Sequence, residues 1–264
     1  MNHDDIHNDD LTHRNDKHES TKDRTLENEK REYMGEFWSD HLTRELSFKE
    51  KSDIFFLKHS QIEYFRPFFS GKNCIDVGCG LGYAIGALED QGLDVDGMEP
   101  DPKAAEVVNK SIKRGKCYTG FYDKFSPAKK YDIVWLSHTL EHVEDPIAAL
   151  EKCYDFTAEN GILCLMVPDC TNPETKKNSM ENKYHVSHFT IDDIKALVKK
   201  TRYETIKIQS FKRVDKWTIR FHKLLWLCKM SKVSLLLNPY FPFSKTDQND
   251  GYELRAVLKK KQSE

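Results

Sequence analysis

Hydrophobic positions follow helix and strand periods over most of the chain, but not at its start. Residues 1–30 are polar and charged, with almost no large aliphatic side chains. Such a segment cannot bury enough apolar surface to offset the entropy lost on ordering, so we expect a disordered tail. Aromatic and aliphatic side chains then recur at helical spacing, which predicts two or three helices that form an N-terminal cap over residues 31–70.

From residue 71 onward, short apolar runs rich in β-formers alternate with amphipathic stretches. This alternation predicts a doubly wound α/β fold with a mostly parallel sheet. Asp101-Pro102, Asp145-Pro146 and Thr190 are typical helix starts, whereas the polar stretch up to Lys183 predicts a mobile loop. The seven expected strands are Cys74–Val77, Leu93–Met98, Cys117–Thr119, Tyr131–Leu136, Gly161–Val167, Tyr203–Gln209 and Tyr252–Leu258.

A long insertion separates the last two expected strands within the domain predicted over residues 71–264. About forty residues, at about 210–251, stand there, which is too long for an ordinary connection. Residues 211–237 carry seven Lys or Arg against a single acid, and their apolar side chains recur at helical spacing. A basic amphipathic helix suits an anionic membrane surface. It equally suits a lid over the active site or a dimer contact, and a nucleic-acid role is the remaining alternative. Of these we favour the lid, because no other segment offers a membrane anchor.

Composition narrows the class of protein. The 264 residues include 41 Lys or Arg and 43 Asp or Glu, so the net charge is close to zero. The protein therefore has no overall positive electrostatic field that would attract nucleic acid, and we expect no nucleic-acid partner. Seven cysteines without a C-x-x-C pair indicate buried thiols in a reducing compartment, not a disulfide framework or a zinc site. With no signal-peptide pattern and no long apolar run, we expect a cytoplasmic protein, with the inner face of the membrane as a peripheral alternative.

One stretch carries the main functional motif. Asp76 ends an apolar run and is followed by Gly78, Gly80 and Gly82, in the pattern D-x-G-x-G-x-G. Glycine lets the backbone turn sharply after a strand and approach a ligand closely. A dinucleotide loop would need its third glycine at Tyr83, so the spacing argues against NAD. The stretch resembles motif I of the class I methyltransferases that use S-adenosylmethionine.

Three further segments stand in the order of that family. They are the acid Glu99, the pair Gly120-Phe121, and the run from Tyr131 to Pro146. The resemblance covers residues 70–200 and is closest to ubiquinone-biosynthesis and other small-molecule O-methyltransferases, which carry a similar L-E-H-V-x-D-P run. It implies a Rossmann-like fold, S-adenosylmethionine as cofactor, and a transferase of class EC 2.1.1.

The resemblance also assigns a cofactor site. A carboxylate at the end of the second strand can accept both ribose hydroxyls, and Glu99 holds that place. Asp76 either binds the cationic amino group of the cofactor or braces the loop. Phe121 either lies against the adenine or packs in the core. The full expected set is Asp76, Gly78, Cys79, Gly80, Gly82, Glu99, Pro100, Phe121 and Ser137.

Four histidines are candidates for the catalytic base. Methyl transfer to a hydroxyl needs a group that takes up its proton, and histidine titrates in a suitable range. His138, His142, His185 and His188 all follow strands at the edge where open α/β sheets bind ligands, and His138 is our first choice. Related enzymes have an acid at the position of His138 and in some cases a divalent metal at the E-H pair. Because this acid is absent here, we assign no metal ligand.

We therefore expect a methyltransferase that acts on oxygen in a small-molecule, glycan or lipid-linked acceptor. N-methylation or C-methylation stays an alternative, because these motifs do not identify the atom that receives the methyl group. A catalytically silent module that binds the cofactor and acts at a membrane or with a protein partner is the rival from another class. The intact glycines and Glu99 argue for a retained cofactor site.

Overall fold

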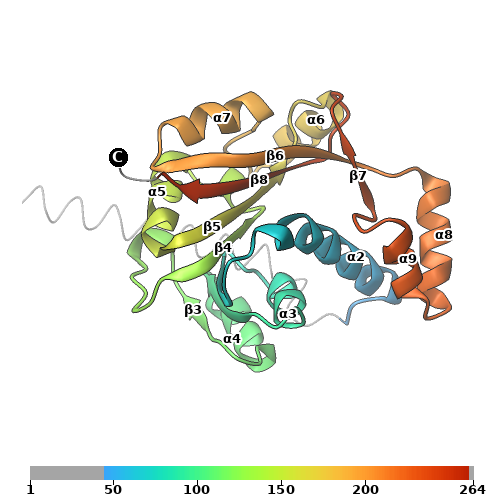
Figure 1. Cartoon of the computed structure of the whole chain (residues 1–264), viewed down its shortest axis with the longest axis horizontal. Helices are drawn as coiled ribbons and strands as arrows, with labels where there is room; N and C mark the ends of the chain where they lie inside the picture. The colour runs from blue at the N-terminus through green and yellow to red at the C-terminus, as the bar shows by residue number, and fades with distance from the viewer. Residues whose placement is uncertain (1–44, 262–264) are drawn as a thin grey trace, which may run out of the picture. The chain divides into compact units, whose positions relative to one another are not determined.

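An eight-stranded sheet runs through the part of the chain that the computed structural model describes, residues 45–261 (Figure 1). The strand order is β3-β2-β1-β4-β5-β8-β6-β7. The first five strands in this order pair in parallel, whereas β8 is antiparallel to both β5 and β6. The strands are β1 (Asn73–Val77), β2 (Asp94–Glu99), β3 (Cys117–Thr119), β4 (Tyr131–Ser137), β5 (Thr157–Pro168), β6 (Tyr203–Arg213), β7 (Phe243–Thr246) and β8 (Glu253–Lys260).

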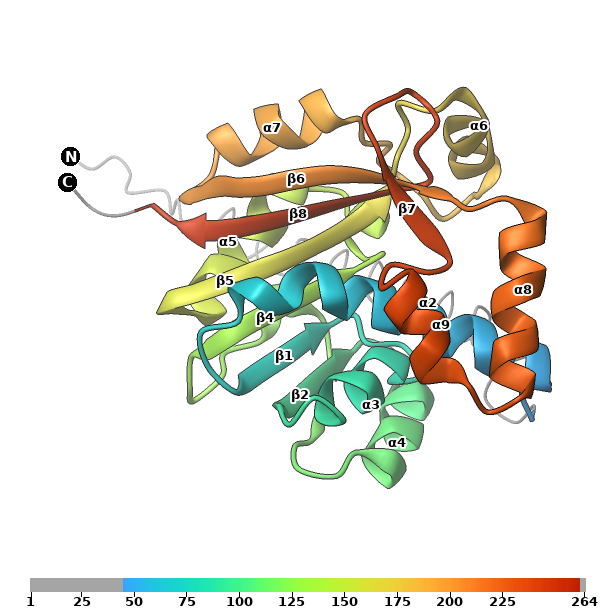
Figure 2. The ribbon, with the colours of Figure 1, turned by 45° about the vertical axis from the view of Figure 1, so that its right-hand side comes forward.

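Helices cover both faces of the sheet (Figure 2). Side chains of α2, α3 and α4 pack with one face, and side chains of α5 and α7 pack with the other. Two separate apolar clusters result, as a doubly wound sheet requires. The α-helices are α2 (Phe48–Phe65), α3 (Tyr83–Glu89), α4 (Pro102–Ser111), α5 (Pro146–Phe156), α6 (Pro173–Glu181), α7 (Ile191–Lys199), α8 (Lys216–Leu227) and α9 (Ser231–Leu237). Short 3-10 helices span Arg66–Phe68, Tyr122–Lys124 and Leu140–His142.

The predicted helix starts are confirmed. The Asp101 carboxylate accepts from the backbone N–H groups of Lys103 and Ala104, and Asp145 accepts from those of Ile147 and Ala148. Thr190 caps α7 in a reciprocal capping box. Because a cap satisfies backbone donors within its own turn, these boundaries depend on neighbouring residues and can be predicted from the sequence.

The predicted mobile loop before Lys183 is wrong. Asn172 caps α6 there, with Pro173 in its first turn. The Asn172 amide and the Thr175 hydroxyl both donate to the carbonyl of Gly251, at 2.9 and 3.0 Å. Contacts with the turn before β8 therefore hold this polar helix, which buries little apolar surface of its own.

The insertion contributes an eighth strand to the sheet, where the sequence predicted seven. The strand β6 continues to Arg213 and pairs with β7, which lies inside the insertion and forms the edge of the sheet. The single predicted helix is instead two, α8 and α9, with Lys229 between them in a left-handed conformation at φ 58°. The predicted tail over residues 1–30 and the part of the cap up to residue 44 lie outside the described residues.

The seven cysteines are free thiols, six of them buried and Cys228 exposed. The buried Cys79 and Cys117 sulfurs lie 3.5 Å apart beside the glycine loop. Over residues 45–261, no helix combines the length and apolarity needed to cross a membrane. The cytoplasmic location stays a prediction.

Candidate active site

The glycine loop connects β1 to α3 at the carboxyl edge of the parallel strands. Gly78, Gly80 and Gly82 all have positive φ, at 74°, 54° and 76°. The backbone N–H groups of Gly78 and Cys79 both donate to the Met98 carbonyl, at 2.8 and 3.0 Å. A Cβ atom at Gly78 would lie 2.5 Å from the Thr139 hydroxyl oxygen. Glycine is therefore required at position 78 by both conformation and space.

Glu99 lies opposite this loop at the end of β2. Its side chain is buried, and the Gly80 N–H donates to its Oε2 at 2.8 Å. The Asp101 N–H donates to Oε1 at 3.2 Å. Two backbone donors thus fix the carboxylate against the loop, where the sequence predicts that it receives the ribose hydroxyls.

Asp76 lies in the strand that precedes the loop and is also buried. Burial raises the pKa of Asp76 to about 7, and the nearby Glu99 carboxylate adds to the rise while Lys58 opposes it. Lys58 comes from α2, and burial lowers the pKa of its ammonium. An additional cation beside Asp76 would favour the ionised carboxylate. An amino-acid ligand carries such a cation in its ammonium group.

The other expected cofactor residues lie at neighbouring strand ends. Phe121 is half-buried, and the Gly120 N–H before it donates to the Glu99 carbonyl at 3.0 Å. Pro100 directly follows Glu99 and is half-buried as well. Ser137 ends β4, and its buried hydroxyl has no hydrogen-bond partner among residues 45–261. The fold brings these side chains to one edge, and their roles toward the cofactor stay predictions.

His138 is held between two buried carboxylates. Its Nε2 lies 2.8 Å from Glu253 Oε2 and its Nδ1 lies 3.3 Å from Glu141 Oε1. Burial disfavours the charged ring, but the two hydrogen bonds outweigh this and raise the pKa of His138 to about 9. The backbone is left-handed there, at φ 54°. Both ring nitrogens are therefore occupied, and the ring is a bound cation at neutral pH.

Residues from α2 and β8 that the sequence motifs did not indicate extend this network. Gln61 Nε2 donates to Glu253 Oε2 at 2.8 Å, and Lys58 donates to Gln61 Oε1 at 3.2 Å. The fully buried Arg255 donates through Nε to Glu253 Oε1 at 2.6 Å. Burial raises the pKa of Glu253, but the charges of Arg255 and His138 outweigh it and hold the pKa below its ordinary value. The available signal was the presence of two charged residues, Glu253 and Arg255, in the otherwise largely apolar strand predicted over Tyr252–Leu258.

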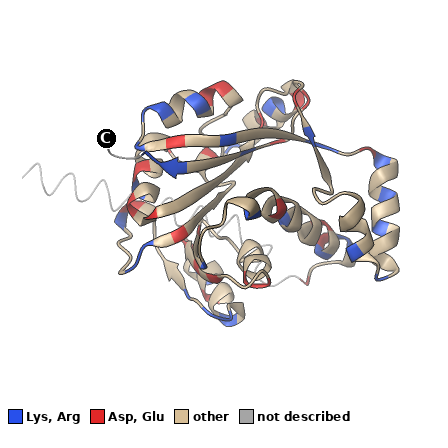
Figure 3. Cartoon of the chain, viewed as in Figure 1, with Lys and Arg blue, Asp and Glu red and all other residues tan. Residues whose placement is uncertain are grey.

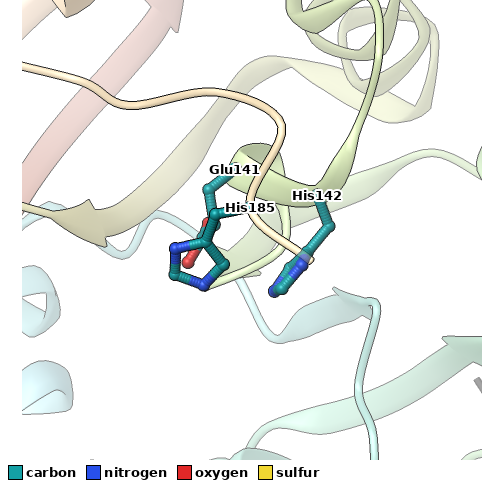
Figure 4. A group of neighbouring side chains, drawn as sticks. All are labelled: Glu141, His142 and His185. Carbon is teal, nitrogen blue, oxygen red and sulfur yellow. The ribbon is translucent and has the colours of Figure 1, made fainter. Parts of the chain in front are cut away.

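Glu141, His142 and His185 form a second group (Figure 4). It adjoins His138 through the contact of that ring with Glu141. One ligand atom from each lies within 4.8 Å of the others. His142 Nδ1 donates to the Tyr184 carbonyl at 2.9 Å, so the neutral ring keeps its lone pair on Nε2. Glu141 Oε2 is buried without a partner among the described residues. Burial favours a higher pKa for Glu141, but its hydrogen bond with His138 outweighs this and lowers the pKa.

His185 and His188 share one hydroxyl. Their Nδ1 atoms lie 2.8 and 2.9 Å from the Ser179 oxygen, which α6 supplies. Burial lowers the pKa of His185. The rings of His185 and His142 meet edge to face, with centroids 4.8 Å apart. The loop after β5 and the segment after β4 thus bring three of the four predicted histidines, His138, His142 and His185, to Glu141. His188 is not part of this group.

The two imidazoles of this group and the Glu141 carboxylate make a donor set that fits a divalent cation. Two imidazoles and one carboxylate suit first-row metals, and His142 has the hydrogen bond to a carbonyl that typically orients a ligating histidine. The same set suits proton transfer, because it places an imidazole beside a carboxylate.

Comparisons with known proteins identify the family of this chain. A family model described as a methyltransferase domain matches residues 31–208. A ubiquinone biosynthesis O-methyltransferase from Psychrobacter arcticus is 26% identical over 114 residues, which cover 40% of this chain and 44% of that relative. The matched part therefore spans less than half the length of this relative.

Two solved structures have a similar fold. One is an S-adenosylmethionine-dependent methyltransferase from Thermotoga maritima, described as a possible histamine N-methyltransferase, with 18% identity and a TM-score of 0.56 over 81% of this chain and 96% of that chain. The other is the magnesium protoporphyrin IX methyltransferase from Synechocystis, solved with S-adenosylhomocysteine, with 14% identity and a TM-score of 0.55 over 87% and 97%. These likenesses confirm the predicted fold class.

Proposed function

Because this chain belongs to the methyltransferase domain family, we propose that it transfers the methyl group of S-adenosylmethionine to a hydroxyl group. The acceptor is a small molecule, a glycan or a lipid-linked precursor. The observation that carries the cofactor assignment is the contact of Gly80 with the buried Glu99 carboxylate, at 2.8 Å. It places an acid against a glycine loop at the carboxyl edge of the sheet, where open α/β folds bind nucleotides.

The cofactor supplies a methyl group on a positively charged sulfur. The protein therefore has to bind the cofactor, align the acceptor with the methyl carbon, and exclude water. Glu99 accepts hydrogen bonds from the ribose. Asp76 pairs with the amino group, whose charge favours the ionised form of this carboxylate. Gly78, Gly80 and Gly82 allow the positive φ angles that turn the backbone of this loop toward the ligand.

His142 is the base that this geometry favours. Its Nδ1 is bonded to a carbonyl, so Nε2 can accept the proton of the acceptor hydroxyl as oxygen attacks the methyl carbon and the carbon–sulfur bond breaks. His138 is less suited, because carboxylates occupy both of its nitrogens. We assign it to positioning Glu141.

A divalent cation held by Glu141, His142 and His185 would occupy Nε2 of His142 and would lower the pKa of a hydroxyl bound to it, so that the hydroxyl proton would pass to solvent instead. Asp76, Glu99 and the glycines have their proposed roles in either case. The two cases differ only in what takes up the proton of the acceptor hydroxyl.

The test uses methyl-labelled S-adenosylmethionine with a catechol and with an aromatic amine of similar size. We expect transfer to the catechol, and a drop of about 10²-fold or more in kcat for His142→Gln. Glu99→Ala is expected to weaken S-adenosylhomocysteine binding by about 1–3 kcal/mol in calorimetry. Glu106→Ala, on the exposed side of α4, is the matched control. Transfer to the amine alone would replace O-methylation, and binding of NADH in place of the adenosyl compounds would overturn the cofactor assignment.

A further inference from the structure

The helices α8 and α9 present large apolar side chains to solvent. They lie side by side at one side of the molecule in both views (Figures 1 and 2). Trp217, Phe221 and Leu224 are 75%, 50% and 57% exposed, and their spacing places them on one stripe of α8. We call the apolar side chains of these two helices that are at least half exposed the α8–α9 face. Its members are Trp217, Phe221, Leu224, Leu227, Leu236 and Leu237.

The opposite side of α8 already packs against the body of the protein. The Trp226 ring lies 4.6 Å from that of Phe55 and 5.3 Å from that of Phe56. His222 stacks on Phe241 at 4.1 Å. The α8–α9 face therefore points away from the core, and closing it over the active site as a lid would require α8 to give up these contacts.

Positive charge surrounds this face. Residues 216–237 contain five Lys or Arg and no Asp or Glu. Figure 3 accordingly shows blue and no red on α8. Lys223 pairs with Asp53 at 2.8 Å. The other four cations form no salt bridge with any residue in 45–261, and they are Lys216, Arg220, Lys229 and Lys232.

We propose that the α8–α9 face binds the surface of an anionic phospholipid membrane. Exposed aromatic and aliphatic side chains match the acyl boundary of such a surface, and the flanking cations match its headgroups. A second copy of this chain is a poorer occupant, because a symmetric contact would oppose the same cations on both sides. The proposal does not rest on the acceptor chemistry, since membrane binding is measured without turnover.

The experiment measures sedimentation of the full chain with vesicles. We expect binding to phosphatidylcholine vesicles that contain phosphatidylglycerol, weaker binding to pure phosphatidylcholine, and release as NaCl rises from about 0.05 M to about 0.5 M. Each cation near an anionic leaflet contributes about a fivefold factor to partitioning. Lys216→Glu with Arg220→Glu is therefore expected to weaken binding at least about tenfold.

Matched variants separate the face from general surface effects. Leu224→Glu is expected to release the protein, whereas Met180→Glu, at an equally exposed apolar position on α6, is not. Lys195→Glu with Lys199→Glu has the same spacing on α7 and serves as the charge control. The proposal is overturned if the full chain stays in solution with anionic vesicles, or if the control variants reduce binding as much as the test variants. A dimer that Leu224→Glu dissociates, without vesicle binding, would assign the face to a second copy.

Discussion

His138 Nε2 lies 2.8 Å from Glu253 Oε2, although 115 residues separate them in the chain. The contact joins the segment after β4 to the first residue of β8. Through its other nitrogen the same ring reaches Glu141, beside the histidines of the candidate active site. A cation at position 138 thus compensates two buried acids at once. The charge balance of the site is therefore set by β8 as well as by the motif.

Removing this cation is expected to destabilise the fold. His138→Ala leaves Glu141 and Glu253 buried without it, and a broken buried pair costs about 3–5 kcal/mol. The ring is 35% exposed, so solvent screening reduces our expectation to about 1–3 kcal/mol in urea unfolding. Adding Glu141→Gln to His138→Ala should recover part of the loss, because Glu141 forms no other salt bridge among the described residues. His59→Ala, at a half-buried position on α2, is the control, and an equal loss there would refute the pairing argument.

Cofactor binding is expected to strengthen with pH. The pKa of Asp76 is about 7, so the carboxylate is mostly protonated at pH 6 and mostly ionised at pH 8. Because an ammonium group prefers the ionised form, the affinity for S-adenosylhomocysteine should rise up to about tenfold over this interval.

Calorimetry of Asp76→Asn provides the control, since this variant should bind weakly and without the pH dependence. In the absence of ligand the sign is opposite. A raised carboxyl pKa stabilises the fold below the unfolded value of 3.8, and this contribution is lost as pH rises through about 7. An equal affinity at pH 6 and pH 8 in the wild type would indicate that Asp76 only braces the loop.

Divalent cations are expected to stabilise the protein through Glu141, His142 and His185. A ligand that binds only the folded state at 100 times its Kd adds about 2.7 kcal/mol to the free energy of unfolding. We expect Mn²⁺ or Zn²⁺ to raise the Tm of the wild type, and His185→Ala to abolish the shift. His188→Ala removes a ring from the same hydroxyl, Ser179, but leaves the cluster intact, so the shift should persist. Identical shifts in both variants would exclude the site.

Two glycine-to-alanine substitutions are expected to differ in sign. Gly78 has φ 74°, and a Cβ there would clash with Thr139, so Gly78→Ala should destabilise the fold by at least about 1 kcal/mol and weaken cofactor binding. Gly86 lies inside α3, and no atom of a neighbouring element comes within 4 Å of the position that a Cβ would take. Gly86→Ala should therefore increase the free energy of unfolding by up to about 1 kcal/mol. Thermal unfolding of both variants measures the difference. A neutral Gly78→Ala would mean that the loop can adopt another path.

Features that depend on neighbouring residues could be predicted from the sequence. The glycine loop, the acid at Glu99 and the caps at Asp101 and Asp145 each act through backbone groups a few residues away or at the end of an adjacent strand. Long apolar runs likewise located most strands, with boundaries a few residues off. These signals sufficed for the fold class.

Features that depend on distant partners could not be predicted. The helix α6 is polar, and contacts with Gly251 hold it, so its own sequence carries little helix signal. His185 joins His142 only because the loop after β5 returns to the segment after β4. The pairing of Glu253 with His138 likewise needs the position of β8 in the sheet. Contacts between residues far apart in the sequence cannot be predicted from local patterns, even where each residue is a charged or histidine side chain that local patterns single out.

Cys228 gives the chain a natural point of attachment for a spectroscopic probe. It is the exposed thiol, whereas Cys74, Cys79, Cys117, Cys153, Cys164 and Cys170 are buried. A maleimide dye or a nitroxide spin label should therefore react first at the end of α8 in the folded protein, with no cysteine removed beforehand. Accessibility of that label to oxygen or to a paramagnetic nickel complex would then report how deeply this helix terminus is immersed.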